Sequence, residues 1–287
     1  MKIQAITDGE TSAINYWMSG IAKHSKHDIS IRHFGIDKGE RPDLIYFHYG
    51  SMILEGDNEA YVKAHPEIKY GFNIAGPLDF SRMVWWINAS SDNKKITRGV
   101  MMLGKKFESD FKAIIPDVPT YITEIGVDMS LFPRETPPRH FIVGYAENNN
   151  YPLTDGNLHR LIKCGFPIIL AGNGKGTDRG FSEMPAFYKS VSVFIDPTVE
   201  PRPGGLMFLE AASTGRPVVA MKSGILANWF PEEFLVEDDA GMVKKLGELK
   251  NPDYYNYAST LWYEVAKSRD YSIVAGEYDR AFEEMVK

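Results

Sequence analysis

Two glutamates flank a glycine-bearing loop in the second half of the chain. Glu200 precedes the loop, which ends at Gly204 and Gly205, and Glu210 lies in the apolar segment that follows. Leucine, methionine and alanine recur there at helical spacing, which predicts a helix over 206–213. The first turn of a helix has unpaired backbone N–H groups and about half a positive charge, and glycines let a phosphate approach the backbone. The pattern therefore predicts an anion site at the start of this helix.

Two short apolar segments enclose the loop and the helix. Residues 191–195 combine β-branched and aromatic side chains, and residues 217–221 form a second such run. Gly215 and Pro217 end the helix between them. Strand, loop, helix and strand form one βαβ unit, in which the helix starts at Leu206. Nucleotides bind at such helix starts in α/β folds.

Glu210 is the one charged residue in this helix. A buried carboxylate is costly unless something hydrogen-bonds to it, and a ribose diol would do so, as in dinucleotide-binding folds. The alternative is a Glu210 that faces solvent or caps a neighbouring loop. Its residue type and position alone leave both possibilities open.

Two predicted strand ends in the first half carry further candidates. Residues 42–49 form a near-continuous apolar strand with His48 at its carboxyl end, and residues 2–6 form a strand that is followed by Gly9 and Glu10. Ligands bind outside the carboxyl ends of parallel strands, so His48 is a candidate catalytic residue. A structural histidine and a plain tight turn are the alternatives.

The composition indicates a globular protein with two domains. A chain of 287 residues exceeds what one core usually holds, and 44% hydrophobic residues is ordinary. No apolar run approaches the roughly 18 residues that span a bilayer, and no signal sequence is recognised, so a cytoplasmic protein is expected. The single cysteine, Cys164, excludes an intramolecular disulfide and a thiolate metal cluster. The net charge of −6 argues against a dedicated nucleic-acid binder, although residues 82–112 carry seven basic and three acidic side chains.

Two segments resemble motifs of a known family. The segment TYITEIGVDMSLFP, residues 120–133, resembles the sequence with which GT-B glycosyltransferases of family 4 leave their first domain. The segment 200–220 resembles the donor-site motif of the same retaining enzymes. That likeness rests on Glu200, Arg202-Pro203, Gly205-Leu206, Leu209-Glu210-Ala211, Gly215 and Pro217-Val218-Val219-Ala220.

The sequence departs from the family pattern at several positions. Nine residues separate the two glutamates, where the family has seven. Tyr145 and Asp155 stand where the family has an arginine and a lysine that neutralise the donor diphosphate, and no histidine follows the strand 70–74. Either cations from other loops, Arg202 among them, replace these charges, or backbone N–H groups hold the donor, or donor binding has been lost.

The resemblance implies a GT-B fold, which consists of two Rossmann-like α/β domains that face each other across a cleft. Residues 1–133 would form the acceptor domain and residues 139–267 the nucleotide-sugar domain. Residues 268–287 would form a C-terminal helix that packs back on the first domain.

The resemblance also implies a reaction and a set of roles. Glu200 would act on the sugar, Glu210 would bind the ribose, and Arg202 would bind the diphosphate. Other donor contacts would come from Gly9, Glu10, Gly172, Met184, Tyr188 and the helix start at Gly204, Gly205 and Leu206. The substrates would be a nucleotide sugar of the UDP or GDP type and a glycan or other hydroxyl acceptor, and transfer would retain the anomeric configuration. Neither a cofactor nor a metal is expected, because the helix start would stabilise the departing phosphate charge.

Three other functions are compatible with the sequence. A DNA-modifying glycosyltransferase, as in small virus-encoded enzymes of this fold, would use the basic segment 82–112 to bind nucleic acid. A non-catalytic nucleotide-sugar-binding module would account for the missing arginine and lysine. A sugar-nucleotide epimerase of the same architecture would release free nucleotide from its donor without an acceptor.

Overall fold

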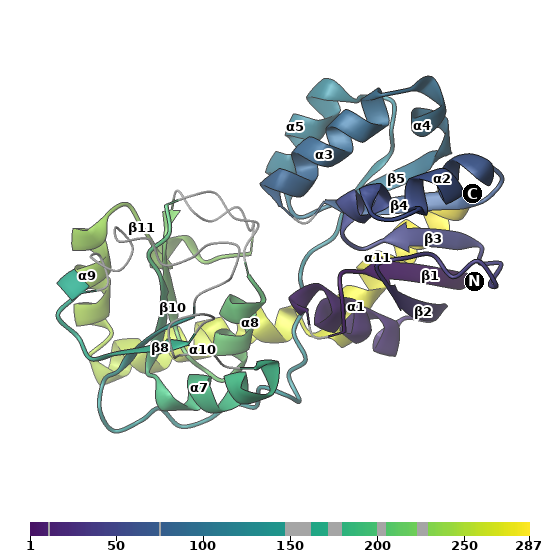
Figure 1. Ribbon diagram of the computed structural model, residues 1–287. Coiled ribbons are helices and arrows are strands. Elements are labelled where there is room, and N and C mark those ends of the chain that lie inside the picture. Colours follow the sequence, from purple (N-terminus) through teal and green to yellow (C-terminus); the bar gives the residue numbers. More distant parts are fainter. Residues whose placement is uncertain (11, 75, 147–161, 172–179, 200–204, 223–228) are drawn as a thin grey trace. The chain divides into compact units, whose positions relative to one another are not determined.

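The chain forms two α/β units. The computed structural model describes residues 1–287 apart from 11, 75, 147–161, 172–179, 200–204 and 223–228 (Figure 1). Unit 1 comprises Met1–Gly126 and Tyr271–Lys287, and unit 2 comprises Val127–Asp270. The stretch 133–138, a polar segment rich in proline, lies in unit 2. In both units the strands of the sheet run parallel, which confirms the predicted architecture of two α/β domains.

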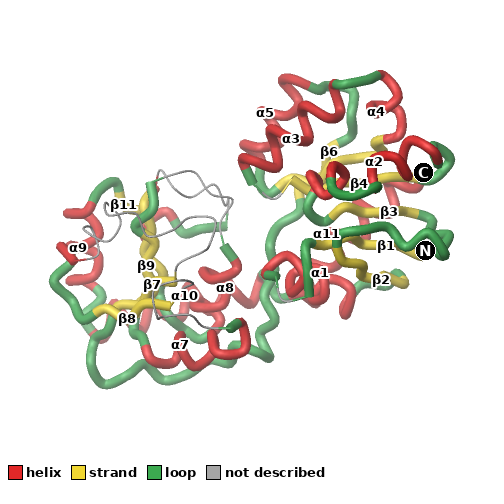
Figure 2. The backbone as a smooth tube through the Cα atoms, viewed as in Figure 1, coloured by secondary structure: helices red, strands yellow, loops and turns green. Residues whose placement is uncertain are grey.

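The sheet of unit 1 has six described strands in the order β2-β1-β3-β4-β5-β6. Figure 2 shows them as neighbouring segments of one twisted layer. The four central strands, second to fifth in this order, have mostly buried side chains, as expected for a parallel sheet covered by helices on both faces. The strands are β1 (Lys2–Thr7), β2 (Asp28–His33), β3 (Leu44–Phe47), β4 (Lys69–Ile74), β5 (Thr97–Met102) and β6 (Thr120–Ile122).

Helices cover both faces of this sheet. Figure 1 shows α1 and α11 on one face and α3, α4 and α5 on the other. The bounds are α1 (Ala13–His24), the 3-10 helix η1 (Gly50–Leu54), α2 (Asn58–Ala64), α3 (Pro77–Asn88), α4 (Ser91–Ile96), α5 (Lys105–Ile114) and α11 (Tyr271–Val286). Ser12 caps α1, since its hydroxyl accepts a hydrogen bond of 2.9 Å from the Asn15 backbone N–H.

The C-terminal helix α11 packs closely on the sheet of unit 1. A Cβ at Gly71 would lie 2.5 Å from Met285 Sδ, and a Cβ at Gly20 would lie 2.3 Å from the Tyr271 ring. These two glycines therefore give α11 the room that it needs against β4 and α1. This arrangement agrees with the prediction that the last helix returns to the first domain.

The sheet of unit 2 has five described strands in the order β11-β10-β9-β7-β8. They are β7 (Val143–Ala146), β8 (Ile168–Ala171), β9 (Val193–Asp196), β10 (Val218–Met221) and β11 (Leu235–Val236). The helices are η2 (Phe181–Glu183), α7 (Met184–Ser190), α8 (Leu206–Ser213), η4 (Glu232–Phe234), α9 (Asp239–Glu248) and α10 (Pro252–Ser268). The predicted βαβ unit is thus β9, α8 and β10.

Two predicted strands are shorter in the structure. The segment 42–49 is a strand only over Leu44–Phe47, because the Asp79 carboxylate accepts hydrogen bonds from the backbone N–H groups of Gly50 and Ser51 and the chain turns into η1 there. The segment 233–236 begins as a helical turn and keeps two strand residues. No helix in the described part of the chain is long and apolar enough to cross a membrane.

Candidate functional site

The helix α8 starts directly after the predicted phosphate loop. Gly205 is its N-cap, with an extended backbone (φ −99°, ψ 153°), and Leu206 is its first residue. The Gly205 carbonyl accepts a hydrogen bond of 3.1 Å from the Phe208 N–H. Gly205 has no side chain and makes no side-chain cap, which is the kind of helix start at which anions bind. Glu200, Arg202, Gly204 and Gly172 lie outside the described residues.

Glu210 is buried in the middle of α8 and is hydrogen-bonded. Its side chain is 5% exposed, and Tyr188 Oη donates a hydrogen bond of 2.8 Å to Glu210 Oε2. Burial raises the pKa of Glu210 from 4.5 to about 7, and the bond from Tyr188 opposes this rise. A group that titrates near neutral pH and has a defined donor is a functional-site candidate.

Both the ring and the backbone of Tyr188 are fixed by contacts. Its fully buried ring contacts the rings of Phe132, Phe187 and Phe194, with centroid distances of 5.9, 5.2 and 5.8 Å. Its backbone carbonyl accepts a hydrogen bond of 3.0 Å from Arg216 Nε. The resemblance implies that Tyr188 contacts the donor; in the structure its ring is fully buried and its hydroxyl donates to Glu210. Met184, also implied to contact the donor, begins α7 and is half-buried.

Arg216 is a buried residue that the sequence reasoning missed. It is fully buried, and its guanidinium donates to the backbone carbonyls of Tyr188, Glu135, Thr136 and Thr214 at 2.8 to 3.2 Å. Burial lowers the pKa of Arg216, and nearby Tyr255 and Glu135 oppose the shift. The sequence feature that could have indicated Arg216 is its place directly after Gly215, the glycine that ends the helix and has a φ of +78°. Arg216 fixes the segment that carries Tyr188, and through it the surroundings of Glu210.

Gly9 and Glu10 follow β1 in unit 1, as predicted. Gly9 has a φ of +139°, a conformation that other residues rarely adopt, so the turn requires glycine. Glu10 is exposed, and its backbone carbonyl accepts a hydrogen bond of 2.8 Å from Asn15 Nδ2. Both residues lie at the carboxyl end of a parallel strand, where α/β folds bind ligands.

His48 is part of the core of unit 1. It is fully buried, and its ring centroid lies 4.4 Å from that of Trp17 and 6.2 Å from that of Tyr278. Burial lowers the pKa of His48 from 6.5 to about 3, so the imidazole is neutral near pH 7. Its position gives no support to the catalytic role expected from the sequence.

Polar groups near His48 bind the backbone. Asn73 Nδ2 donates to the His48 carbonyl at 3.0 Å, and Asp79 Oδ1 accepts from the Ser51 N–H at 2.6 Å. Asn73 and Asp79 therefore hold the turn between β3 and η1.

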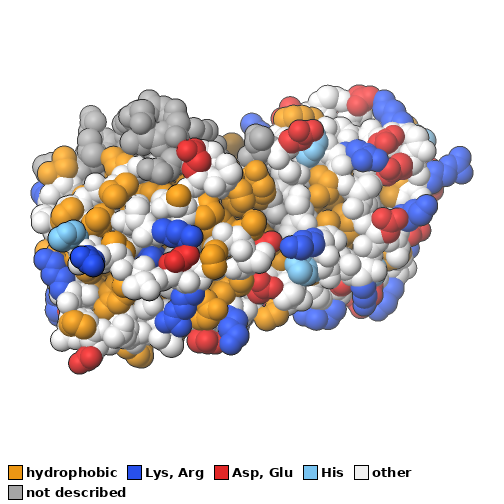
Figure 3. Space-filling model, turned by 90° about the horizontal axis from the view of Figure 1, so that it is seen from below, with side chains coloured by type: hydrophobic (Ala, Val, Ile, Leu, Met, Phe, Trp, Pro, Cys, Tyr) orange, Lys and Arg blue, Asp and Glu red, His pale blue; other side chains and the backbone are white. Residues whose placement is uncertain are grey.

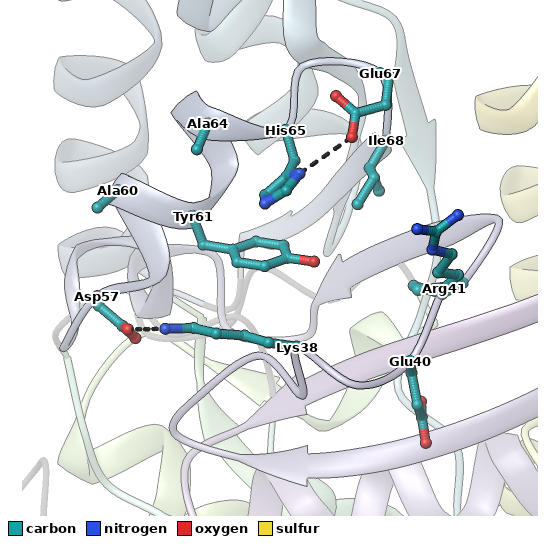
Figure 4. Close-up of a pocket in the computed structure, with 11 residues that line it drawn as sticks. Lys38, Glu40, Arg41, Asp57, Ala60, Tyr61, Ala64, His65, Glu67 and Ile68 are labelled. Carbon is teal, nitrogen blue, oxygen red and sulfur yellow. Dashed lines mark hydrogen bonds and ion pairs between the residues drawn. The ribbon is translucent and has the colours of Figure 1, made fainter.

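A cavity of about 650 Å³ lies in unit 1 near the amino ends of β3 and β4 (Figure 4). It is lined by residues that precede β3 and β4, among them Arg41, Tyr61 and His65. Lys38 pairs with Asp57, and His65 with Glu67, so much of its charge is already balanced. None of the sequence-predicted site residues lines it.

The basic segment 82–112 is spread over α3, α4, β5 and α5. Lys95 pairs with Asp92 at 3.4 Å and Lys112 with Glu108 at 3.0 Å, which leaves a positive excess on this part of unit 1. On the face of the molecule drawn in Figure 3, basic and acidic side chains are intermixed. Among the described residues, no group of three or more His, Cys, Asp or Glu side chains is arranged to hold a metal ion.

No protein-family model matches the chain, and no curated protein matches its sequence. Solved structures match its fold. The structure of Anabaena Alr3699/HepE in complex with UDP and glucose has a TM-score of 0.74 at 14% identity and covers 99% of both chains. The DNA-modifying enzyme β-glucosyltransferase, studied with and without uridine diphosphoglucose, has a TM-score of 0.62 at 11% identity and covers 100% of this chain and 99% of that one. The pneumococcal O-GlcNAc transferase GtfA with UDP and GlcNAc has a TM-score of 0.61 at 10% identity, over 85% of this chain and 57% of that one. The chain therefore has the GT-B fold.

Proposed function

We propose that the chain is a glycosyltransferase that takes a sugar from a UDP sugar and transfers it to a hydroxyl acceptor. The observation that carries this proposal is the buried carboxylate of Glu210, set in the helix whose N-terminus follows the glycine loop. A buried carboxylate and a helix start without a side-chain cap, both on α8, suit a ribose and a diphosphate. The solved structures of the same fold, HepE, β-glucosyltransferase and GtfA, were determined with UDP or a UDP sugar.

The donor would bind to unit 2. Glu210 accepts a hydrogen bond from the ribose, and the first turn of α8 binds the diphosphate. Arg202 supplies the positive charge that the missing arginine and lysine do not. Glu200 acts on the sugar. These roles rest on the resemblance of the segment 200–220 to family 4 enzymes.

In the proposed reaction, the bond between the anomeric carbon and the diphosphate oxygen breaks, and a bond to the acceptor oxygen forms on the same face of the sugar. The acceptor proton passes to the leaving phosphate, so no separate base is needed. The α8 N-terminus stabilises the charge that develops on this phosphate, and the reaction proceeds without a metal. The acceptor is a glycan or another hydroxyl compound.

A thermal-shift panel tests the donor class. UDP, GDP, ADP, dTDP and CDP, with their sugar conjugates, are added without metal. A ligand at 100 times its dissociation constant stabilises the protein by about 2.7 kcal/mol. We expect a shift with UDP and its sugars. No shift with any of the compounds would contradict the proposal.

Transfer to a modified base of DNA is the second candidate. It is favoured by the basic excess in 82–112 and by the match to β-glucosyltransferase, a DNA-modifying enzyme. Binding to duplex DNA that falls steeply between 50 and 200 mM salt, as expected for several phosphate contacts, would favour it over a glycan acceptor. Transfer to DNA that contains a hydroxymethylated base would establish it.

A further inference from the structure

Within the described residues, the Glu210 carboxylate accepts a side-chain hydrogen bond on one oxygen. Tyr188 Oη donates to Glu210 Oε2 at 2.8 Å, and among the described residues no donor to Oε1 is recorded. The side chain keeps 5% of its surface exposed. A carboxylate can accept several hydrogen bonds, so Glu210 retains capacity for a ligand.

The hydroxyl that occupies Oε2 is rigidly placed. Three aromatic rings, those of Phe132, Phe187 and Phe194, surround the Tyr188 ring, and Arg216 Nε binds the Tyr188 carbonyl at 3.0 Å. A movement of the hydroxyl away from Glu210 would disturb this packing, which a close-packed interior resists.

We propose that Tyr188 is the positioning residue of the nucleotide site. Its hydroxyl holds Oε2 of Glu210 and leaves Oε1 to accept a hydrogen bond from one ribose hydroxyl. This inference rests on the proposed function, because it requires a ribonucleotide in unit 2. It implies that the site distinguishes the two ribose hydroxyls and binds one of them more strongly than the other.

Tyr188 also stabilises the ionised form of Glu210. Its hydrogen bond favours the ionised carboxylate, which accepts stronger hydrogen bonds than the neutral acid. The elements packed against α8 are α7, α10, β10 and β9, and the titratable residue of β9 is Asp196. β10 has no titratable residue. The titratable groups on α7 and α10 are Tyr188, Lys189, Asp253, Tyr254, Tyr255, Tyr257, Tyr263, Glu264 and Lys267, and Tyr188 is the one that shifts the pKa of Glu210. Without the hydroxyl, the carboxylate would ionise at a higher pH.

Isothermal titration of UDP, 2′-deoxy-UDP and 3′-deoxy-UDP tests this inference. Wild type and Tyr188→Phe are compared from pH 6 to pH 9. Tyr70→Phe is the matched control, since it removes a tyrosine hydroxyl that donates to the His65 carbonyl at 2.9 Å in unit 1. A second variant, Glu210→Gln, keeps an oxygen for Tyr188 but removes the charge.

We expect wild type to bind one deoxy analogue on the order of tenfold more weakly than UDP, and the other nearly as well. In Tyr188→Phe, UDP affinity falls by a similar factor at pH 7, the difference between the analogues shrinks, and affinity recovers as the pH rises. Tyr70→Phe behaves as wild type, and Glu210→Gln loses the pH dependence.

Two results separate this inference from the proposed function. If wild type binds UDP and Tyr188→Phe keeps its affinity, its preference for one analogue and its pH profile, the positioning role is wrong and the function stands. If wild type binds none of the three nucleotides, the proposed UDP site and the role of Tyr188 in it are both wrong.

Discussion

His48 in unit 1 and Glu210 in unit 2 are buried titratable side chains with opposite outcomes. Burial disfavours the charged form of each: it lowers the pKa of His48 to about 3 and raises that of Glu210 to about 7. Near pH 7 the imidazole stays neutral, whereas Glu210 is close to half-ionised. Burial alone therefore does not indicate a site.

The difference lies in what surrounds each group. The His48 imidazole is packed against aromatic rings, and within the described residues its polar contact is a 3.4 Å approach of Nδ1 to Tyr46 Oη. Glu210 has a hydroxyl donor at 2.8 Å, and Arg216 holds the donor's backbone. A buried group that is supported by a network of this kind can keep its charge available for a ligand.

The largest effect is expected from removal of the Arg216 network. Arg216→Met leaves the backbone carbonyls of Tyr188, Glu135, Thr136 and Thr214 without this donor. We expect the free energy of unfolding of unit 2 to fall by about 3 to 5 kcal/mol, as when a buried charged partner is lost. Urea denaturation followed by Trp fluorescence measures it.

Arg134→Met is the control for that experiment. Arg134 lies in the same unit and donates to Thr260 Oγ1 at 3.2 Å, in an exposed position. Its loss should cost about 1 kcal/mol or less. Equal urea midpoints for the two variants would mean that Arg216 does not anchor the Tyr188 segment.

Glu210→Gln should change how stability depends on pH. The native pKa of about 7 lies above the ordinary 4.5, so wild type loses stability as the pH rises from 4.5 to 7, by about 3 kcal/mol in total. Glutamine has no such loss. Relative to wild type, the variant should therefore be more stable at pH 8 than at pH 5, which thermal unfolding at the two pH values measures. A pH-independent difference would contradict the burial of an ionisable Glu210.

His48→Phe should show a pH effect of the opposite sense. In the unfolded chain His48 takes up a proton near pH 6.5, and in the native protein only near pH 3, so wild type loses stability as the pH falls below 6.5. At pH 5 this amounts to about 2 kcal/mol. The variant lacks this acid-dependent loss of stability. A packing cost of the phenyl ring is the same at both pH values, so it cancels in the difference in stability between pH 7 and pH 5. Unchanged transferase activity at pH 7 would also separate His48 from catalysis.

The smallest free-energy effects are expected in ligand binding. Glu210→Ala should weaken UDP binding about tenfold, the effect of about 1.4 kcal/mol that one hydrogen bond to a charged group provides. Glu200→Ala should reduce turnover more than binding, and Arg202→Ala should weaken UDP but not uridine. Titration calorimetry and transfer rates measure these effects. Wild-type behaviour of both glutamate variants would disprove the site in unit 2.

Local sequence patterns were enough to predict most of the fold. The apolar runs of β9 and β10, the helical spacing of α8 and the glycine before it are properties of neighbouring residues, so periodicity and turn chemistry indicate them directly. The same neighbourhood placed Glu210 in an apolar helix and Gly9 in a tight turn. The motif at 200–220 pointed to the GT-B fold.

The contacts of the candidate site depend on residues far apart in the chain. Tyr188 and Glu210 are 22 positions apart, and Arg216 reaches carbonyls 80 and 81 positions away. His48 is enclosed partly by Tyr278 of the last helix. Periodicity carries no information on such pairings, because it describes only which side of one element is apolar. The sequence by itself therefore determined the elements and the candidate residues, whereas tertiary packing decided that Tyr188 binds Glu210, that Arg216 supports it and that His48 belongs to the core.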